Sequence, residues 1–215
     1  MELKETHNLW IGLVKISELK QHEYAIEDHV YNIRKSLEKT KILRKPIIAD
    51  INTGLVIDGA HRTRALSSLD AKYIPAILVN YLDNKEITLN KWIRIYLMNI
   101  SSRDLSYIKS IFTFNEITIT NSTIKVKLYN NGLDSYMQIN KFENDYKNQI
   151  NKIKFSKSID KKIRIKNALI LEPPLLTKEE VVRAAENQIL LPPRSTRHIT
   201  DLKKVYISYP LKYLF

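Results

Sequence analysis

The sequence contains no cysteine, and this absence excludes several kinds of chemistry at once. Disulfide bonds, thiolate zinc sites, iron–sulfur clusters and cysteine nucleophiles all need a thiol. No apolar run approaches the ~18 residues that span a membrane. The first residues, MELKETHNLW, carry acids and lack the apolar core of a signal peptide. We therefore expect a soluble, cytoplasmic protein that makes no contact with a membrane.

What the chain does contain is a surplus of basic residues. Among its 215 residues, 35 Lys and Arg stand against 23 Asp and Glu, which gives a formal net charge of +12. Such a surplus indicates anionic partners, such as nucleotides or nucleic acid, without choosing among them. Hydrophobic residues make up 44% of the chain, which is enough to build a packed core.

The first part of the chain alternates predicted strands and helices. Residues 28–39 place Val30, Ile33 and Leu37 on one face at helical spacing, which predicts an amphipathic helix. A glycine-containing turn at 52–54 separates two short apolar runs and predicts a hairpin. The predicted elements of this region are strands at 13–16, 46–49, 55–57 and 74–79 and helices at 28–39 and 61–69. Together they predict a small α/β layer with short connections.

The middle of the chain gives fewer local signals. The segment 92–98 is mixed apolar and is interpreted as a helix. The segments 117–120 and 124–128 flank an Asn-Ser turn and predict a hairpin. The stretch 133–154 is polar and helical in tendency, and we expect it to face solvent because charge-rich helical stretches usually do.

A sharper signal marks a helix near the end of the chain. Thr177 and Glu180 fit the T-x-x-E capping box, and Pro192-Pro193 stops the helix that they open. The fold class predicted from the whole pattern is α/β (α+β). We expect an N-terminal core over residues 1–85 and a smaller mixed α/β C-terminal lobe over residues 86–215.

Three segments carry candidate chemistry, and the first is Asp58-Gly59-Ala60-His61-Arg62. A glycine between a strand end and a helix start lets the backbone turn tightly, and the free amides of the first helical turn then favour an anion such as phosphate. Arg62 adds a forked donor that suits phosphate oxygens. A capped helix with surface arginines gives the same pattern, so this segment alone leaves both interpretations open.

The second segment is the tail 192–198, Pro-Pro-Arg-Ser-Thr-Arg-His. It brings two arginines, two hydroxyls and an imidazole into five positions without a carboxylate. This composition is typical of a phosphate-binding loop. A basic, solvated surface loop is the alternative.

The third segment is the loop 19–24, which offers His22 and Glu23 after the first predicted strand. Loops at strand ends often carry catalytic groups, and a carboxylate can orient a hydroxyl and accept its proton during phosphoryl transfer. From the residues alone, either side chain could act, and both could also simply be exposed.

These three segments together resemble a known family. Residues 19–81 are similar to the ParB/sulfiredoxin-type domain, whose hallmark strand–turn–helix is written here over residues 56–66. Within that superfamily the chain resembles the free serine kinases of archaea over most of its length. The loop 19–23, the segment 58–62 and the tail 192–198 each match a motif of that family. The tail discriminates most, because simple ParB-like domains are not expected to carry it.

The resemblance implies a reaction and a role for each motif. The terminal phosphoryl group of ATP or ADP would pass to the hydroxyl of L-serine with the help of Mg²⁺, giving O-phospho-L-serine, a precursor for cysteine biosynthesis. Glu23 is implied as the base, Asp58 as the residue that holds magnesium or substrate, and His22 and Trp92 as substrate-side residues. The implied phosphate-binding residues are Gly59, Ala60, His61, Arg62, Arg194, Ser195, Thr196, Arg197 and His198. We expect the three segments to meet in one pocket.

One departure and two rivals remain. The family often has two histidines in the phosphate loop, whereas Ala60 stands at the first position here, so the choice between ADP and ATP stays open. Sulfiredoxin chemistry is excluded, because it needs a cysteine at that position. A ParB-like DNA-binding or nucleotide-switch protein is the stronger rival, although no helix-turn-helix pattern follows residue 81. A regulatory module that binds nucleotide without reacting is the third class. The sequence does not indicate the oligomeric state.

Overall fold

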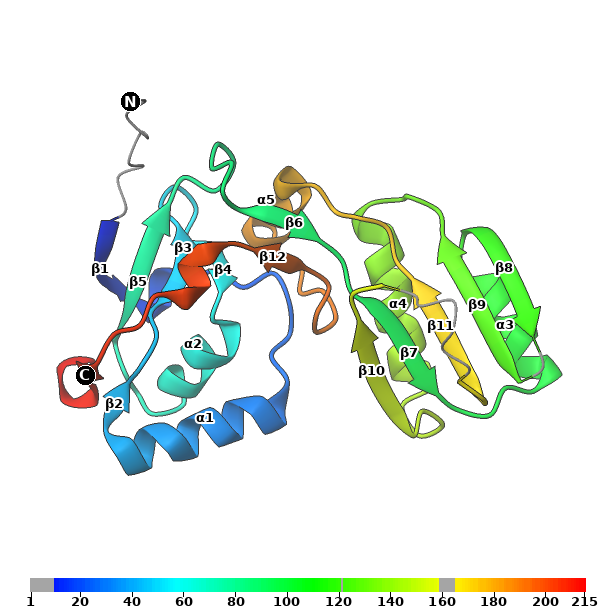
Figure 1. The fold of residues 1–215 in the computed structure, drawn as a ribbon, viewed down its shortest axis with the longest axis horizontal. Helices are drawn as coiled ribbons and strands as arrows, with labels where there is room; N and C mark the ends of the chain where they lie inside the picture. The colour runs from blue at the N-terminus through cyan, green and yellow to red at the C-terminus, as the bar shows by residue number, and fades with distance from the viewer. Residues whose placement is uncertain (1–9, 121, 159–164) are drawn as a thin grey trace, which may run out of the picture. The chain divides into compact units, whose positions relative to one another are not determined.

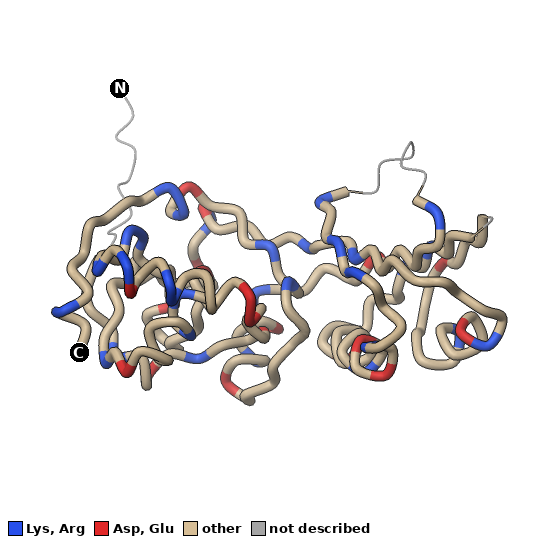
Figure 2. The backbone as a smooth tube through the Cα atoms, turned by 90° about the horizontal axis from the view of Figure 1, so that it is seen from below, with Lys and Arg blue, Asp and Glu red and all other residues tan. Residues whose placement is uncertain are grey.

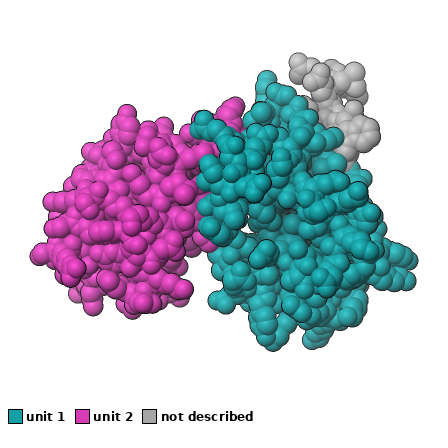
Figure 3. All heavy atoms as spheres, turned by 180° about the vertical axis from the view of Figure 1, so that it is seen from behind, with its two compact units in different colours: residues 1–88, 182–190, 198–215 teal, residues 89–181, 191–197 magenta. Residues whose placement is uncertain are grey.

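The fold is seen in a computed structural model that describes residues 10–120, 122–158 and 165–215. By its internal contacts the chain divides into two compact units, coloured separately in Figure 3. Unit 1 and unit 2 are each built from segments that are distant in the sequence. Unit 1 comprises residues 1–88, 182–190 and 198–215, and unit 2 comprises residues 89–181 and 191–197.

The predicted division into domains over residues 1–85 and 86–215 stays a prediction. The first change of unit, after residue 88, falls close to the predicted boundary, but residues 198–215 group with unit 1. In the part of the chain that the structure describes, no helix has both the length and the apolar character needed to cross a membrane.

Unit 1 contains a four-stranded sheet in the order β1-β5-β3-β4 (Figure 1). β3 and β4 form the predicted antiparallel hairpin, β5 runs parallel to β3, and β1 runs antiparallel to β5. The strands are β1 (Trp10–Lys15), β3 (Ile47–Asp50), β4 (Val56–Asp58) and β5 (Tyr73–Val79). All four strands predicted for this region are confirmed, with small shifts of their ends.

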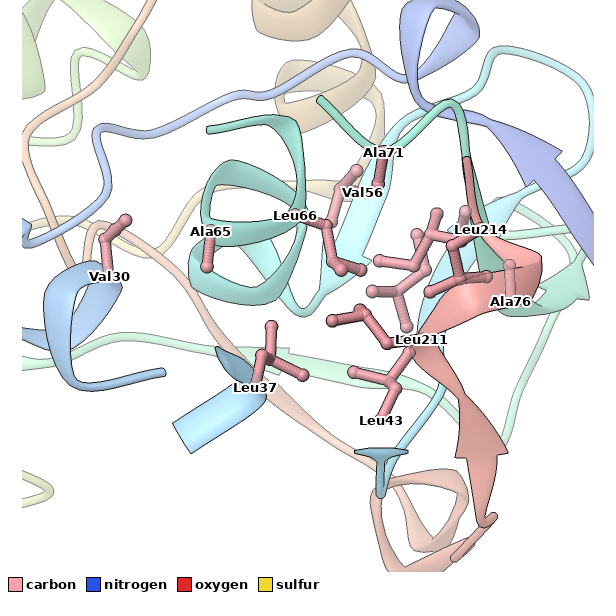
Figure 4. Close-up of a cluster of buried hydrophobic side chains, with 13 residues drawn as sticks. Val30, Leu37, Leu43, Val56, Ala65, Leu66, Ala71, Ala76, Leu211 and Leu214 are labelled. Atoms are coloured by element: carbon pink, nitrogen blue, oxygen red, sulfur yellow. The ribbon is translucent and has the colours of Figure 1, made fainter. Parts of the chain in front are cut away.

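Two helices, α1 (Glu27–Thr40) and α2 (Ala60–Ser67), pack with the sheet around one hydrophobic core (Figure 4). α1 forms as predicted, since Val30 and Leu37 are buried and Ile33 packs against the same core. Its first turn carries two acidic residues, whose negative charges interact favourably with the positive end of the helix dipole. The helix predicted over residues 61–69 is confirmed as α2, whose Ala65 and Leu66 are fully buried.

The C-terminal residues complete the core of unit 1. β13 (Tyr209–Pro210) pairs antiparallel with β2 (Ile42–Leu43), and the 3-10 helix η3 (Leu211–Tyr213) follows. Leu211 and Leu214 belong to the same buried cluster as the helices (Figure 4). The carbonyl of Leu214 accepts hydrogen bonds from the amides of Lys72 and Tyr73 at 2.7 and 3.0 Å. The sequence pattern did not predict this return of the chain.

Unit 2 contains a five-stranded sheet in the order β10-β7-β11-β9-β8. The β8–β9 pair is the predicted hairpin, and β9 and β11 are the parallel pair in an otherwise antiparallel sheet. The strands are β7 (Ile93–Leu97), β8 (Phe114–Thr120), β9 (Thr123–Leu128), β10 (Lys152–Ser156) and β11 (Ala168–Glu172).

The helix predicted over residues 92–98 is wrong, because this segment is strand β7. Ile93 and Ile95 pack in a buried cluster with β11, whereas Arg94 and Tyr96 alternate with them and are fully buried as well. A strand buried on both faces loses the simple polar–apolar alternation that identifies a strand in a sequence.

The stretch 133–154 also differs from its prediction. It is helical as α4 (Leu133–Asp145), but residues 152–156 form β10. The helix does not lie free in solvent, because Tyr136, Ile139 and Phe142 are buried, and the Phe142 ring lies 5.2 Å from that of Tyr96. Lys141 and Asn144 of the same helix are exposed, so the polar composition hid an amphipathic helix. A further helix, α3 (Ser102–Ile111), begins with a capping box at Ser101.

The helix predicted after Thr177 is α5 (Lys178–Glu186). Its capping box is confirmed, since the Thr177 amide donates to the Glu180 carboxylate at 2.8 Å and the Glu180 amide donates to the Thr177 hydroxyl at 3.2 Å. Lys and Arg lie along the backbone of both units, with Asp and Glu between them (Figure 2). The remaining short elements are η1 (Ile16–Glu18), β6 (Thr88–Asn90), β12 (Arg197–Ile199) and η2 (Asp201–Lys204).

Candidate active site

The junction between β4 and α2 has the geometry that the sequence predicted for segment 58–62. Gly59 is the N-cap of α2 and has a φ of 108°, which L side chains rarely adopt. A Cβ on Gly59 would lie 2.5 Å from a methyl of Ile47 and 2.8 Å from Nη2 of Arg62. No side chain caps the helix at Gly59. The amides of Ala60, His61 and Arg62 therefore begin the helix in the way that favours an anion.

Asp58 lies between two basic side chains of unit 1. Its Oδ2 accepts from Arg62 Nη2 at 2.8 Å, and its Oδ1 lies 3.0 Å from Lys203 Nζ. Burial alone would raise the pKa of Asp58, but the Lys203 ammonium and the Arg62 guanidinium hold it below its ordinary value. The carboxylate is therefore ionised at neutral pH and holds both cations at the end of β4.

The surroundings of Asp58 do not fit a magnesium site. Magnesium in kinases is usually held by one or two carboxylates together with substrate phosphates. Each oxygen of Asp58 already faces a cation, Arg62 Nη2 on one side and Lys203 Nζ on the other. The metal role predicted for Asp58 does not fit this arrangement, in which both carboxylate oxygens are paired with basic side chains.

The loop that carries Glu23 is attached to the β4–α2 segment at two points. At one end, the Lys20 amide donates to the Gly54 carbonyl and the Lys20 carbonyl accepts from the Val56 amide, both at 2.9 Å. At the other end, the Ile26 amide donates to Nε2 of His61 at 3.0 Å. This bond makes His61 Nε2 an acceptor, so that nitrogen is not available as a phosphate donor. Residues 20–26 therefore run along the strand and helix that form the glycine junction.

Glu23 lies within this loop with its side chain 16% exposed, and its Oε2 is 3.9 Å from Nε2 of His22. His22 is buried, contrary to the alternative that both residues are exposed. Burial lowers the pKa of His22 to about 4, so the imidazole is neutral at neutral pH and is a weak base. At neutral pH the imidazole therefore carries no positive charge beside the Glu23 carboxylate.

His198, the last residue of the predicted phosphate-binding tail, is buried in unit 1. Its Nε2 is 2.7 Å from the hydroxyl of Tyr81, and its ring meets that of His22 edge-on at 5.8 Å. The side chain thus belongs to a polar cluster with Tyr81 and with His22, the neighbour of Glu23 in its loop. A contact between His198 and phosphate stays a prediction.

The other tail residues lie in unit 2 together with Trp92. The Arg194 guanidinium lies 5.5 Å from the centroid of the Trp92 ring and 4.9 Å from that of Phe155. The Arg197 guanidinium also lies 5.5 Å from the Trp92 ring. Arg194 has a φ of 58°, an uncommon conformation for a residue other than glycine. Both arginines therefore gather at one aromatic side chain, an arrangement that the sequence did not predict.

The hydroxyls of the tail are less exposed than the phosphate-loop prediction implies. Ser195 is buried, and its Oγ donates to the Pro192 carbonyl at 2.6 Å. Thr196 is buried as well. The Ser195 hydroxyl thus stabilises the loop after the two prolines. The contacts of Ser195 and Thr196 with phosphate stay predictions.

The predicted site residues fall into two sets. Unit 1 brings together His22, Glu23, Asp58, Gly59, Ala60, His61, Arg62 and His198, and unit 2 brings together Trp92, Arg194, Ser195, Thr196 and Arg197. The sequence did not indicate three further residues, namely Lys203, which pairs with Asp58, Tyr81, which contacts His198, and Arg94, which donates to the Pro193 carbonyl. Lys203 and Arg94 carried no local signal in a chain so rich in Lys and Arg.

No protein-family model matches the chain. Two curated proteins are similar to it over most of their length. A "ParB-like protein" of Sulfolobus acidocaldarius is 27% identical over 199 residues, covering 89% of this chain and 92% of that protein. An "ATP-dependent L-serine kinase" of Staphylothermus marinus is 23% identical over 229 residues, covering 93% of this chain and 89% of that protein.

Among solved structures, a mutant of a free serine kinase in complex with ADP matches with a TM-score of 0.73 at 16% identity. That match covers 95% of this chain and 94% of the other. The comparison confirms the predicted fold class, since it extends over both units. The chain therefore has the fold of the free serine kinases over 95% of its length.

Proposed function

We propose that this chain is a free L-serine kinase, which transfers the terminal phosphoryl group of ATP or ADP to the hydroxyl of L-serine and releases O-phospho-L-serine. The observation that carries the proposal is the attachment of the Glu23 loop to the β4–α2 segment at Lys20 and at Ile26. This attachment puts a partly buried carboxylate and an anion-binding helix start in one unit. The likeness to an ATP-dependent L-serine kinase supports the same activity.

The phosphate-binding part of the proposal rests on the start of α2. The uncapped amides that follow Gly59 and the guanidinium of Arg62 supply donors and positive charge for phosphate oxygens. Phosphoryl transfer needs mainly positioning and stabilisation of the charge on the moving group. The residues of this junction can provide both without a covalent intermediate.

Glu23 is proposed as the general base. As the serine oxygen forms its bond to the terminal phosphorus, the bond between that phosphorus and the bridging oxygen of the nucleotide breaks. Glu23 accepts the hydroxyl proton, and the shortened nucleotide leaves. His22 is proposed to line the substrate side in its neutral form, since its low pKa leaves it a weak base.

In unit 2, Arg194 and Arg197 are proposed to bind phosphate beside Trp92, with Ser195 and Thr196 shaping the loop. Both guanidinium groups lie 5.5 Å from the centroid of the Trp92 ring, and cations are attracted to the face of such a ring. The need for Mg²⁺ stays a prediction from the resemblance, as does the use of the product in cysteine biosynthesis.

The test is the formation of phosphoserine from L-serine, with ATP and ADP offered separately. Glu23→Gln should lower turnover by about 100-fold or more, while nucleotide affinity measured by calorimetry stays within about twofold, because the amide keeps the shape of the side chain and loses its basicity. Glu18→Gln is the matched control, since Glu18 is an exposed carboxylate on η1 and pairs with Lys15. Equal turnover in Glu23→Gln and wild type would remove Glu23 from the mechanism.

The rival activity, DNA binding of the ParB kind, is tested with random duplex DNA over a salt series. The likeness to a ParB-like protein and the net charge of +12 are the observations that favour it. Tight binding that falls steeply with salt, together with no serine-dependent use of nucleotide, would replace the kinase proposal.

A further inference from the structure

Lys203 shares Asp58 with Arg62, although the two basic residues come from opposite ends of unit 1. Lys203 Nζ lies 3.0 Å from one oxygen of the carboxylate, and Arg62 Nη2 lies 2.8 Å from the other. Two cations around one anion leave an excess of one positive charge. That excess lies at the end of β4, where the uncapped start of α2 adds its own positive potential.

The backbone around Lys203 is held in place by its neighbours. The Thr200 hydroxyl accepts from the Leu202 amide at 3.2 Å and opens η2, and Leu202 is buried. The carbonyl of Lys203 accepts a hydrogen bond from Nζ of Lys45 at 3.3 Å. The side chain of Lys203 therefore starts from a fixed point and is aimed at Asp58.

The neighbouring residue Lys204 does not contact Asp58 in this way, so the pairing is specific to Lys203 within η2. Lys204 pairs with Asp201 within η2, and the side chains of that pair are 79% and 89% exposed. The side chain of Lys203 is 36% exposed, and that of Arg62 is 19% exposed. Lys203 and Arg62 are thus partly shielded, which strengthens their attraction for an anion, and yet remain accessible to one.

Arg62 has donor capacity left over. Its Nε is buried and has no hydrogen-bond partner among the described residues. The absence of a Cβ at Gly59 allows Arg62 Nη2 to lie close to the backbone of the junction. The guanidinium is therefore held at the start of α2 by Asp58 and by the shape of the glycine turn.

We propose that Lys203 is a further phosphate-binding residue of the nucleotide site, and that Asp58 is a positioning residue that holds Lys203 and Arg62 in place. This inference rests on the proposed kinase function. The ligand is the phosphate chain of an adenine nucleotide, which the two cations would contact from the β4 side of the junction. Asp58 then acts through the cations and not through a metal ion.

The experiment measures ADP binding to the full chain by calorimetry, once in EDTA and once with Mg²⁺. Lys203→Ala should weaken ADP binding about tenfold in both buffers, the size expected for one lost charge-assisted contact. Lys203→Arg should recover most of this affinity, because it restores a cation. Lys204→Ala, the adjacent control, should bind ADP as the wild type does.

Asp58→Asn separates the possible roles of the carboxylate. If Asp58 is a positioning residue, the Asn variant no longer holds the Lys203 and Arg62 side chains in place. ADP binding should then weaken about tenfold both with and without Mg²⁺. A metal ligand would show the loss with Mg²⁺ only, and a carboxylate that merely repels phosphate would show tighter binding in the variant. Either of those results would overturn the role proposed for Asp58.

The outcomes distinguish this inference from the function on which it rests. A wild-type chain that binds no ADP or ATP would overturn the kinase proposal and the role of Lys203 together. A wild type that binds ADP while Lys203→Ala matches Lys204→Ala would overturn the role of Lys203 alone. Melting temperatures of all variants show whether Lys203→Ala acts by unfolding unit 1, and a loss of affinity that Lys203→Arg does not recover would also count against the proposal.

Discussion

Arg94 donates a hydrogen bond from Nη2 to the carbonyl of Pro193 at 2.7 Å, although its side chain is fully buried in β7. Its Nη1 pairs with the Glu143 carboxylate of α4 at 2.5 Å, and the same carboxylate accepts from the Tyr96 hydroxyl at 2.9 Å. This network joins the sheet, the helix and the start of the tail in unit 2. The buried Arg94 guanidinium therefore holds the backbone at Pro193, the residue before Arg194.

Replacing Arg94 by Met should destabilise unit 2 by about 3–5 kcal/mol, because it leaves the Glu143 carboxylate without its cation in a partly shielded place. Urea unfolding followed by circular dichroism measures this loss. The control is Lys141→Met, which removes an exposed partner of Asp145 and should leave the midpoint unchanged. Similar midpoints for the two variants would contradict the structural importance of the Arg94 network.

The conformation of Gly59 leads us to expect a loss of stability when a single methyl group is added there. Gly59→Ala should cost about 2 kcal/mol or more, since the φ of 108° is strained for Ala and the Cβ would overlap Ile47 and Arg62. Nucleotide affinity should fall as well. Gly12→Ala in β1 is the control, because nothing lies within 4 Å of its added Cβ. Equal unfolding midpoints for the two variants would show that the turn tolerates a side chain.

Buried His22 predicts a pH dependence of folding. Its pKa falls from 6.5 in the unfolded chain to about 4 in the folded one, because burial disfavours the imidazolium. Between these values the unfolded chain binds more protons, so the free energy of unfolding falls as the pH drops from about 6.5 toward about 4. The slope expected from this residue is about 1.4 kcal/mol per pH unit.

Urea unfolding of wild type and His22→Gln at pH 7, 6 and 5 measures this slope. The variant should lose less stability than the wild type over the same range, because glutamine does not titrate. Parallel lines for the two proteins would mean that His22 is not the residue responsible.

A substitution at Leu214 tests how much the C-terminal segment contributes to the stability of unit 1. Leu214→Ala should destabilise unit 1 by about 2–4 kcal/mol, since the side chain is completely buried in the cluster shown in Figure 4. Leu82→Ala, at an exposed position of the same unit, should have little effect on the melting temperature. An unchanged melting temperature for Leu214→Ala would indicate that the cluster repacks without it.

The elements of unit 1 could be predicted because each has a local signal. Gly54 and Gly59 mark turns, and the spacing of Val30 and Leu37 marks a helix. The strand β7 could not be predicted in the same way, because Arg94 and Tyr96 occupy buried positions through partners far away in the chain. Hydrophobic patterns in a sequence predict an element on the assumption that charged residues are exposed to water. A buried arginine such as Arg94 does not meet that assumption.

The candidate site shows the same division. The glycine junction could be predicted from neighbouring residues in the sequence, whereas the choice of Glu23 over His22 came only from the resemblance to the free serine kinases. The roles of Lys203 and of His61 could not be predicted, because each depends on one contact across the fold, with Asp58 and with the Ile26 amide. His61 in particular looked like a phosphate donor, whereas its Nε2 accepts a hydrogen bond.

Residues 211–214, which close the core of unit 1, are synthesised after residues 89–181 of unit 2. On the ribosome, the unit that emerges first must therefore wait with an incomplete core until the later one has been made. Domains that emerge early usually fold early, so this order reverses the common sequence of events. The apolar surface of α1 and α2 that Leu211 and Leu214 cover in the finished fold stays exposed during that interval.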